Sequence, residues 1–211
     1  MSDARLRLYV DAQYTSPYAL SVFVALREKA LEFDLHPLDL DAHEQQSQAY
    51  AGLSLTQRVP TLEQGGFALS ESSAITEYLD ELFPQAPLYP RDAQQRARAR
   101  QVQAWLRSDL QALRQERSTL VIFYGRKAGP LSAAGEAAAR KLIEAAQVLL
   151  GDGREHLCGQ WSIADVDLAL MLNRLIFNGD PVPAGLVNYA HRQWQHPAVQ
   201  AWVALERPTL G

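Results

Sequence analysis

The sequence predicts an α/β domain with the element order β-α-β and then β-β-α, followed by a second domain built only of helices. Three observations support this prediction. The first 83 residues mix strand-like and helix-like apolar patterns. A stretch with three prolines follows at residues 84–91, and the residues after it show the helical period alone. We therefore divide the chain into domains 1–83 and 92–211, joined by a linker at 84–91.

The first domain is expected to open with a strand, a helix and a second strand. Residues 6–10 alternate polar and apolar side chains and are rich in strand formers. Ser16 is a favoured helix N-cap, and Pro17 is tolerated at the first helical position. Residues 33–38 alternate again and predict the second strand. The polar, irregular residues 40–57 allow one short helix.

A hairpin and a helix complete this domain. Residues 61–63 and 67–69 are strand-like, and they flank Gly65 and Gly66, which tolerate the backbone conformations of tight hairpin turns. Residues 70–73 then begin a helix with an apolar face, which should end before Pro84.

The remainder of the chain is predicted to be helical. Apolar residues share one helix face over residues 102–113 and again over 138–149. A third helix is indicated by Ser162 and Asp165, whose spacing is that of a capping box with Asp in place of Glu or Gln. Weaker helical segments follow at 185–194 and 197–205.

Composition and charge exclude several classes of protein. The 211 residues are 47% apolar, with a mean hydropathy of −0.20. No apolar run approaches the roughly 20 residues that span a bilayer, so we expect no membrane association. A formal charge of −4 disfavours a general nucleic-acid binder. The N-terminal residues lack the pattern of an export signal, so a cytoplasmic location is expected.

Cysteine and histidine usage narrows the chemistry further. Cys158 is the single cysteine, so the chain forms no internal disulfide, has no cysteine cluster for zinc and supports no mechanism that needs two of its own thiols. The count leaves open a mechanism that takes its thiol from a ligand. The five histidines are scattered, and we expect no metal site.

Two motifs suggest a binding site, and each has a structural alternative. A cis bond between Val59 and Pro60 would turn the Val59 backbone outward to pair with a peptide-like ligand. A trans bond would instead make Pro60 an ordinary strand entry. Glu71 and Ser72 open a helix whose N-terminus attracts an anion, while the Glu71 carboxylate suits an ammonium group. The alternative there is plain N-capping.

A hydroxyl group at the start of the first helix is the third candidate. Ser16 can donate a hydrogen bond to a thiolate, an anion that the helix dipole also favours. Capping is again the alternative. No histidine lies nearby in sequence to act as a base for Ser16, and the chain lacks G-x-S-x-G, so a serine hydrolase is poorly supported.

In this order and spacing, the motifs resemble the cytosolic glutathione transferase family over essentially the whole chain. The matching segments are residues 16–17, 58–62, 70–75 and 162–165. Within the family, residues 97–110 resemble the bacterial YfcF-like group. The resemblance implies a thioredoxin-like first domain, an all-helical second domain, a homodimer, and glutathione as co-substrate without a metal.

The resemblance also implies roles for individual residues. Ser16 would donate a hydrogen bond that activates the glutathione thiol, with Tyr14 and Thr15 as rivals for this role. Relatives that use a cysteine have Cys-Pro where this chain has Ser16-Pro17, which disfavours disulfide exchange. The remaining glutathione contacts would be Val59 and cis Pro60 for the cysteinyl unit, Glu71 and Ser72 for the γ-glutamyl end, and Arg58 and Gln45 for the glycine carboxylate. Gln45 departs from the histidine that several relatives carry.

The implied reaction is attack of the glutathione thiolate on a small electrophile, with hydroperoxide reduction as an additional activity. The electrophile pocket is expected between the domains, with Tyr14, Phe123 and Tyr124 as candidate lining residues. Asp165 is expected to be structural, and Cys158 to be a buried apolar residue. The alternatives are a binding or regulatory protein of the same fold without turnover, and a disulfide reductase if Cys158 faced the ligand.

Overall fold

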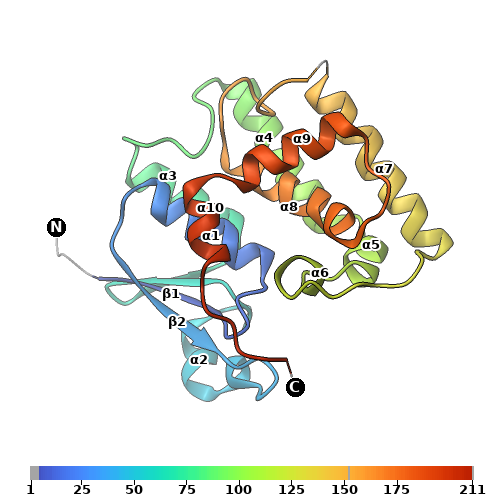
Figure 1. The fold of residues 1–211 in the computed structure, drawn as a ribbon. Coiled ribbons are helices and arrows are strands. Elements are labelled where there is room, and N and C mark those ends of the chain that lie inside the picture. The colour runs from blue at the N-terminus through green and yellow to red at the C-terminus, as the bar shows by residue number, and fades with distance from the viewer. Residues whose placement is uncertain (1–4, 152, 211) are drawn as a thin grey trace. The chain divides into compact units, whose positions relative to one another are not determined.

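The computed structural model describes residues 5–151 and 153–210, which form two compact units (Figure 1). The first unit comprises the chain up to Leu88 together with the segment from Gln200 onward, and the second comprises Tyr89–Val199. The sequence places the last residues in the helical domain. They pack with the first unit because Trp202 is fully buried there, with its ring 5.2 Å from that of Phe23.

The first unit is built on a four-stranded mixed sheet. Its strands are β1 (Leu6–Asp11), β2 (Phe33–Leu38), β3 (Thr61–Gln64) and β4 (Phe67–Ser70). They lie in the order β2-β1-β3-β4, with β2 parallel and β3 antiparallel to β1. The β3–β4 hairpin turns at Gly65 and Gly66, both of which have positive φ. The α/β fold class predicted from the sequence is confirmed.

Helices cover this sheet. They are α1 (Pro17–Glu28), the short 3₁₀ helix η1 (Glu44–Gln46), α2 (Gln48–Leu53) and α3 (Ser72–Leu82). Helices α1 and α3 pack against each other (Figure 1). Their apolar faces meet the strands in a core whose fully buried residues include Leu8, Val10, Leu20, Val24, Ile75 and Leu79.

A buried ion pair joins the ends of α1 and α3. Lys29 Nζ donates to Asp80 Oδ1 at 3.1 Å and to the carbonyls of Phe83 and Ala86, each at 2.7 Å. The two charged side chains are only 1% and 5% exposed. Removal of one partner from such a pair leaves an uncompensated buried charge, which typically costs about 3–5 kcal/mol.

We therefore expect Lys29→Met to lower the free energy of unfolding by about 3 kcal/mol in urea denaturation. The matched control is Arg5→Met. Arg5 pairs with Asp34, but its side chain is 75% exposed, so its loss should cost less than about 1 kcal/mol. Equal losses of unfolding free energy in the two variants would contradict the view that the buried ion pair of Lys29 and Asp80 stabilises the fold.

The second unit is helical. Its helices are α4 (Ala93–Ser108), α5 (Gln111–Glu116), α6 (Leu120–Phe123), α7 (Ala133–Leu150), α8 (Ile163–Asn178) and α9 (Ala184–Trp194), and α10 (Pro197–Val203) crosses into the first unit. The buried helix α8 contacts α4, α6, α7 and α9. The capping box of Ser162 and Asp165 is present at its start, as predicted.

One helix is shorter than the sequence predicts. Residues 102–113 were expected to share one helix face, but α4 ends at Ser108. Leu110 takes a left-handed backbone with φ 59°, and its N–H donates to Asp109 Oδ1 at 2.8 Å. The i→i−4 series is interrupted there and resumes in α5.

A second ion pair makes the stability of this unit depend on pH. The buried Arg117 guanidinium donates to both carboxylate oxygens of Asp180, at 2.6 and 2.7 Å. These hydrogen bonds from Arg117 hold the pKa of Asp180 below its ordinary value. A lowered carboxyl pKa in the folded state stabilises the protein above the unfolded pKa of about 3.9, and this stabilisation is lost as the pH falls through the folded pKa.

We expect the difference in unfolding free energy between wild type and Asp180→Asn to be largest near pH 7 and to shrink below about pH 4. Urea denaturation at both pH values measures it. Glu155→Gln is the control, because Glu155 is 73% exposed and lies 3.9 Å from Arg192. A difference for Asp180→Asn that stays constant with pH would contradict the prediction.

Within residues 5–151 and 153–210, every helix is too short or too polar to span a membrane.

Candidate functional site

The register of the sheet brings distant parts of the sequence to one edge. Tyr9 pairs with Thr61, and Thr61 pairs with Ser70, while Asp11 pairs with Leu38. The segments that follow β1, β2 and β4 and the segment that precedes β3 therefore leave the sheet at the same edge. These segments carry the candidate residues Tyr14, Ser16, Gln45, Arg58, Val59, Pro60, Glu71 and Ser72.

Ser16 is the N-cap of α1. Its Oγ accepts a hydrogen bond from the Ala19 N–H at 3.2 Å, and Pro17 occupies the first helical position. The cap uses Ser16 Oγ as an acceptor, so the hydroxyl proton is not needed for it. Capping and donation to an anion are therefore compatible at Ser16, although the sequence presents them as alternatives.

The neighbouring hydroxyl of Thr15 is already engaged. Thr15 Oγ1 donates to Asp11 Oδ2 at 2.8 Å, and the Thr15 N–H donates to the same oxygen at 2.6 Å. A hydroxyl has one proton, so donation to a ligand would cost Thr15 its bond to Asp11. The ring of Tyr14 packs edge-on against Trp202, with centroids 5.7 Å apart.

The loop before β3 is held by buried hydroxyls. The Val59–Pro60 bond is cis, as the resemblance implies. Tyr50 Oη donates to the Arg58 carbonyl at 2.9 Å, and Thr61 Oγ1 lies 2.9 Å from both Tyr50 Oη and Ser54 Oγ. Burial raises the pKa of Tyr50, so its hydroxyl stays protonated and able to donate. The network fixes the backbone that leads into Val59, which is half-buried.

The start of α3 differs from a simple serine cap. Its N-cap is Glu71, whose side chain makes no capping hydrogen bond. Glu71 has φ 73° and ψ 111°, a region that residues other than glycine rarely adopt and that concentrates at ligand-binding sites. The Glu71 side chain is exposed, whereas Ser72 is 3% exposed at the first position of the helix.

The two candidates for a terminal carboxylate differ in their surroundings. Arg58 is exposed and is a permanent cation. Gln45 lies in η1, where its Nε2 is 3.4 Å from the Leu40 carbonyl. Gln45 Oε1 is buried and has no hydrogen-bond partner among the described residues. Arg58 is thus the stronger candidate.

The remaining candidates belong to the second unit. Phe123 ends α6, and its ring lies 6.1 Å from that of Trp194. Tyr124 is the C-cap residue of α6. Cys158 is 7% exposed, and burial is the largest cause of its raised thiol pKa. The prediction that Cys158 is a buried apolar residue is confirmed.

The Asp165 side chain bonds to groups within its own unit. Its carboxylate accepts hydrogen bonds from the Leu157 N–H, the Ser162 N–H and hydroxyl, and the Tyr189 hydroxyl, at 2.8–2.9 Å. Burial raises the pKa of Asp165, while these hydrogen bonds act in the opposite direction. Asp165 is fully buried and is structural, as expected.

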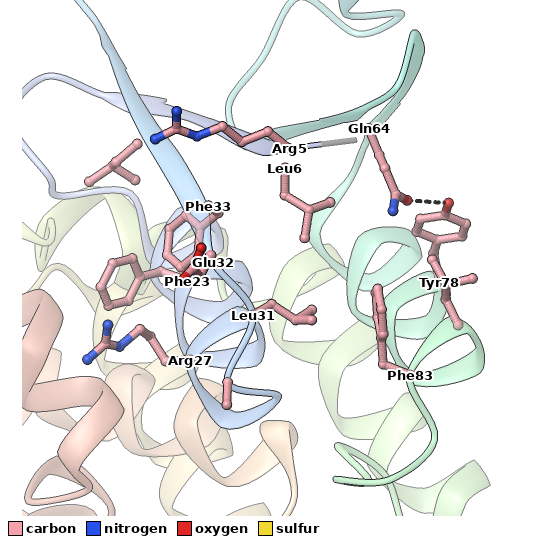
Figure 2. Close-up of a pocket in the computed structure, with 13 residues that line it drawn as sticks. Arg5, Leu6, Phe23, Arg27, Leu31, Glu32, Phe33, Gln64, Tyr78 and Phe83 are labelled. Carbon is pink, nitrogen blue, oxygen red and sulfur yellow. Dashed lines mark hydrogen bonds between the residues drawn. The ribbon is translucent and has the colours of Figure 1, made fainter. Parts of the chain in front are cut away.

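A groove of about 1720 Å³ lies at the other edge of the sheet (Figure 2). Leu6, Phe33 and Gln64 line it, and these residues stand at the starts of β1 and β2 and at the end of β3. Tyr78 donates to Gln64 Oε1 at 2.8 Å on one side of it. None of the candidate site residues is among those that line this groove. The candidate site is therefore separate from it.

Two features of the site were not expected from the sequence. The sequence patterns do not single out Asp11, which accepts hydrogen bonds from the loop of residues 12–16 (the Ser16 loop), or Tyr50, which donates to the Arg58 carbonyl. A carboxylate at the end of a buried strand and five residues before a helix cap is the pattern that could have indicated Asp11. Within the described chain, no group of three or more His, Cys, Asp or Glu residues is arranged to hold a metal ion.

Comparison with known families gives two matches that together cover most of the chain. The family described as glutathione S-transferase, N-terminal domain, matches residues 12–87. The family described as glutathione S-transferase, C-terminal domain, matches residues 92–207.

Individual relatives agree with this. Glutathione S-transferase theta-1 of Mus musculus is 28% identical over 214 residues, which cover 98% of this chain and 84% of the relative. Maleylacetoacetate isomerase of Dictyostelium discoideum is 35% identical over 115 residues, or 54% of this chain. The chain spans about half the length of the first such isomerases it matches, 52% for this protein and 49% for a probable one from Drosophila melanogaster.

Solved structures show the same fold. A glutathione transferase homologue from Burkholderia gl BGR1, crystallised with bound glutathione, is 46% identical with a TM-score of 0.77, covering 94% of this chain and 96% of that one. A theta-class glutathione S-transferase from Xanthomonas axonopodis pv. citri with glutathione bound has a TM-score of 0.78 at 20% identity, covering 96% and 99% of the two chains. At that identity the second likeness concerns the fold alone.

Proposed function

The chain belongs to the glutathione S-transferase family, and from that premise we propose that it binds glutathione and presents the glutathione thiolate to a small electrophile. The observation that supports this most is the hydrogen bonding of Ser16. Its hydroxyl oxygen accepts from the Ala19 N–H, which leaves the proton for the glutathione sulfur. Thr15, the nearest rival, already donates to Asp11.

The free energies involved are of the right size. A free thiol has a pKa near 8.5, so lowering that pKa by about two units requires about 2.7 kcal/mol of preferential stabilisation of the thiolate. A hydrogen bond to a charged group contributes about 1.5–3 kcal/mol. The N-terminus of α1 adds about 0.3–1 kcal/mol. Ser16 and its helix together therefore suffice.

The other residues at this sheet edge suit the rest of a zwitterionic tripeptide. The exposed Glu71 carboxylate complements the γ-glutamyl ammonium group, and the start of α3 at Ser72 complements its carboxylate. Arg58 complements the glycine carboxylate, with Gln45 as a weaker candidate. We assign the Val59 backbone and Pro60 to the cysteinyl unit on the resemblance to the family.

Calorimetric titration tests glutathione binding directly. Wild type is expected to bind glutathione, and Glu71→Gln to bind it about tenfold more weakly because the ammonium group loses its counter-charge. Glu155→Gln, which alters an exposed carboxylate of the second unit, should bind like wild type. Absence of binding by wild type would overturn the proposal.

The similarity to maleylacetoacetate isomerases supports isomerisation as a second candidate activity. A thiolate that adds to a conjugated carbon–carbon double bond converts it to a single bond, which rotates before the thiolate leaves again. This cycle regenerates glutathione. Conjugation of an electrophile consumes one glutathione for each product instead. Reduction of a hydroperoxide consumes two, yielding an alcohol, water and glutathione disulfide.

Stoichiometry therefore separates the candidate activities. The protein is supplied with glutathione and, in separate assays, an aryl halide, a cis-configured conjugated keto acid and an organic hydroperoxide. Consumption of one, zero or two glutathione molecules per product identifies conjugation, isomerisation or peroxidase activity. Binding of glutathione with no turnover across this panel would instead favour a binding or regulatory protein of the same fold.

On the resemblance alone, we further propose that Tyr14, Phe123 and Tyr124 contact the electrophile, and that the protein is a cytoplasmic homodimer. Phe123→Ala should then raise KM for the electrophile several-fold without changing the affinity for glutathione. Sedimentation equilibrium tests the dimer, and a monomer at micromolar concentration would contradict it.

A further inference from the structure

Asp11 is a buried carboxylate that accepts hydrogen bonds from the Ser16 loop. It ends β1 and is 1% exposed. Its Oδ2 accepts from the Thr15 N–H and hydroxyl, at 2.6 and 2.8 Å, and its Oδ1 accepts from the Ser16 N–H at 3.0 Å. Its partners among the described residues are these hydrogen-bond donors, and no ion pair joins it to a lysine or arginine.

The same loop is held from its other side by the C-terminal segment. The Tyr14 carbonyl accepts from Trp202 Nε1 at 3.1 Å and from Arg207 Nη2 at 3.3 Å. The Tyr14 N–H donates to the Asp11 carbonyl at 3.0 Å. Tyr14 itself has φ 50°, a left-handed conformation that needs such support. The donors of the loop thus face Asp11, and its carbonyl faces Trp202 and Arg207.

We propose that Asp11 is a positioning residue that fixes the Ser16 backbone and so aims the Ser16 hydroxyl at the glutathione sulfur. The inference rests on the proposed function. It also explains why Thr15 is not the donor, since the Thr15 hydroxyl already donates its hydrogen bond to the Asp11 carboxylate. The role is indirect, because the Asp11 carboxylate is buried and would act through Ser16.

Only a carboxylate serves all three donors. The side chain must accept at both of its oxygen positions, and an asparagine would offer one oxygen and one NH₂ group. The NH₂ group would then face either the N–H of Ser16 or the donors of Thr15, and the hydrogen bonds on that side would be lost. Asparagine therefore has nearly the same shape as aspartate, but Asp11→Asn removes hydrogen bonds that fix the Ser16 loop.

A simple effect of charge and a positioning role predict opposite shifts of the glutathione thiol pKa in Asp11→Asn. A negative charge near a thiolate opposes ionisation, so removing the Asp11 charge alone would lower the pKa of the bound glutathione thiol. Loss of the Ser16 orientation would instead raise that pKa, because the thiolate loses a donor. The sign of the shift therefore distinguishes a positioning role from a simple effect of charge.

The experiment is a pH titration of the thiolate ultraviolet absorbance of bound glutathione, combined with calorimetric measurement of its Kd. In Asp11→Asn the thiol pKa should rise by about one unit, which lowers the thiolate fraction near pH 6.5 about fivefold, while Kd at that pH changes less than threefold. Asp34→Asn, at the opposite end of the neighbouring strand, should leave both unchanged.

A second variant covers the case in which Asp11→Asn fails to fold. Asp11→Glu keeps the charge but moves the oxygens by one methylene, so it should also raise the thiol pKa. An unchanged or lowered pKa in the folded variants, with a normal thiolate signal in wild type, would overturn the role of Asp11 alone. Absence of a thiolate signal in wild type would overturn the proposed function, and the Asp11 inference with it.

Discussion

Replacing Ser16 by alanine is expected to lower kcat for glutathione conjugation about 15-fold near pH 6.5. The variant loses the hydroxyl proton that we assign to the thiolate but keeps the helix N-terminus, so about 2 of the roughly 2.7 kcal/mol of thiolate stabilisation is lost. A loss of that size raises the thiol pKa from about 6.5 to about 8, and the thiolate fraction at pH 6.5 then falls about 15-fold. The loss should shrink as the pH approaches 9, where the thiol ionises without help. Steady-state kinetics with saturating glutathione between pH 6 and 9 measures both effects.

Two controls separate this effect from loss of the helix cap. Ser16 also caps α1, and an alanine at an N-cap costs about 1 kcal/mol of stability. Ser16→Gly caps nearly as well as serine, so it should match Ser16→Ala in kcat while unfolding closer to wild type. Thr15→Val should retain most of the activity. A rate loss confined to Thr15→Val would move the donor role from Ser16 to Thr15.

Asp165→Ala is expected to lower the free energy of unfolding by about 4 kcal/mol. The substitution leaves the Leu157 N–H, the two Ser162 donors and the Tyr189 hydroxyl buried without their acceptor. Each unsatisfied buried group costs about 1–3 kcal/mol, with some relief from rearrangement. In a chain of this size, the loss corresponds to about 10 °C in Tm.

The matched control is the exposed helix cap Asp92. Asp92 accepts from the N–H groups of Gln94 and Gln95 at the start of α4, at 3.1 and 2.9 Å. Water can replace it there, so Asp92→Ala should cost about 1 kcal/mol. Calorimetry of both variants tests the comparison. A loss at Asp165 no larger than that at Asp92 would show that the buried network contributes little.

Much of the fold could be predicted because local signals agree with it. The Gly65-Gly66 turn, the Ser16-Pro17 helix start and the Ser162 capping box each depend on residues within a few positions of one another. The break at Leu110 has no such signal, since a left-handed leucine is imposed by its surroundings. The return of the C-terminal segment to the first unit likewise depends on burial of Trp202 against Phe23, a contact between distant residues.

The candidate site was predictable in its residue types but not in its hydrogen bonds. The sequence placed Tyr14, Thr15 and Ser16 near one another and left their roles open. Only the side-chain geometry shows that Thr15 donates to Asp11 while Ser16 accepts from Ala19. Patterns of apolar residues carry no information about which way a hydroxyl proton points.

The most direct test of the central claim is the pKa of the glutathione thiol on the wild-type protein. Titration of the thiolate ultraviolet absorbance, with glutathione bound at saturation, gives this value in one experiment. We predict a pKa about two units below the value of about 8.5 for a free thiol, so that thiolate predominates at neutral pH. A pKa at or above that of free glutathione would contradict the claim that this protein activates the thiol.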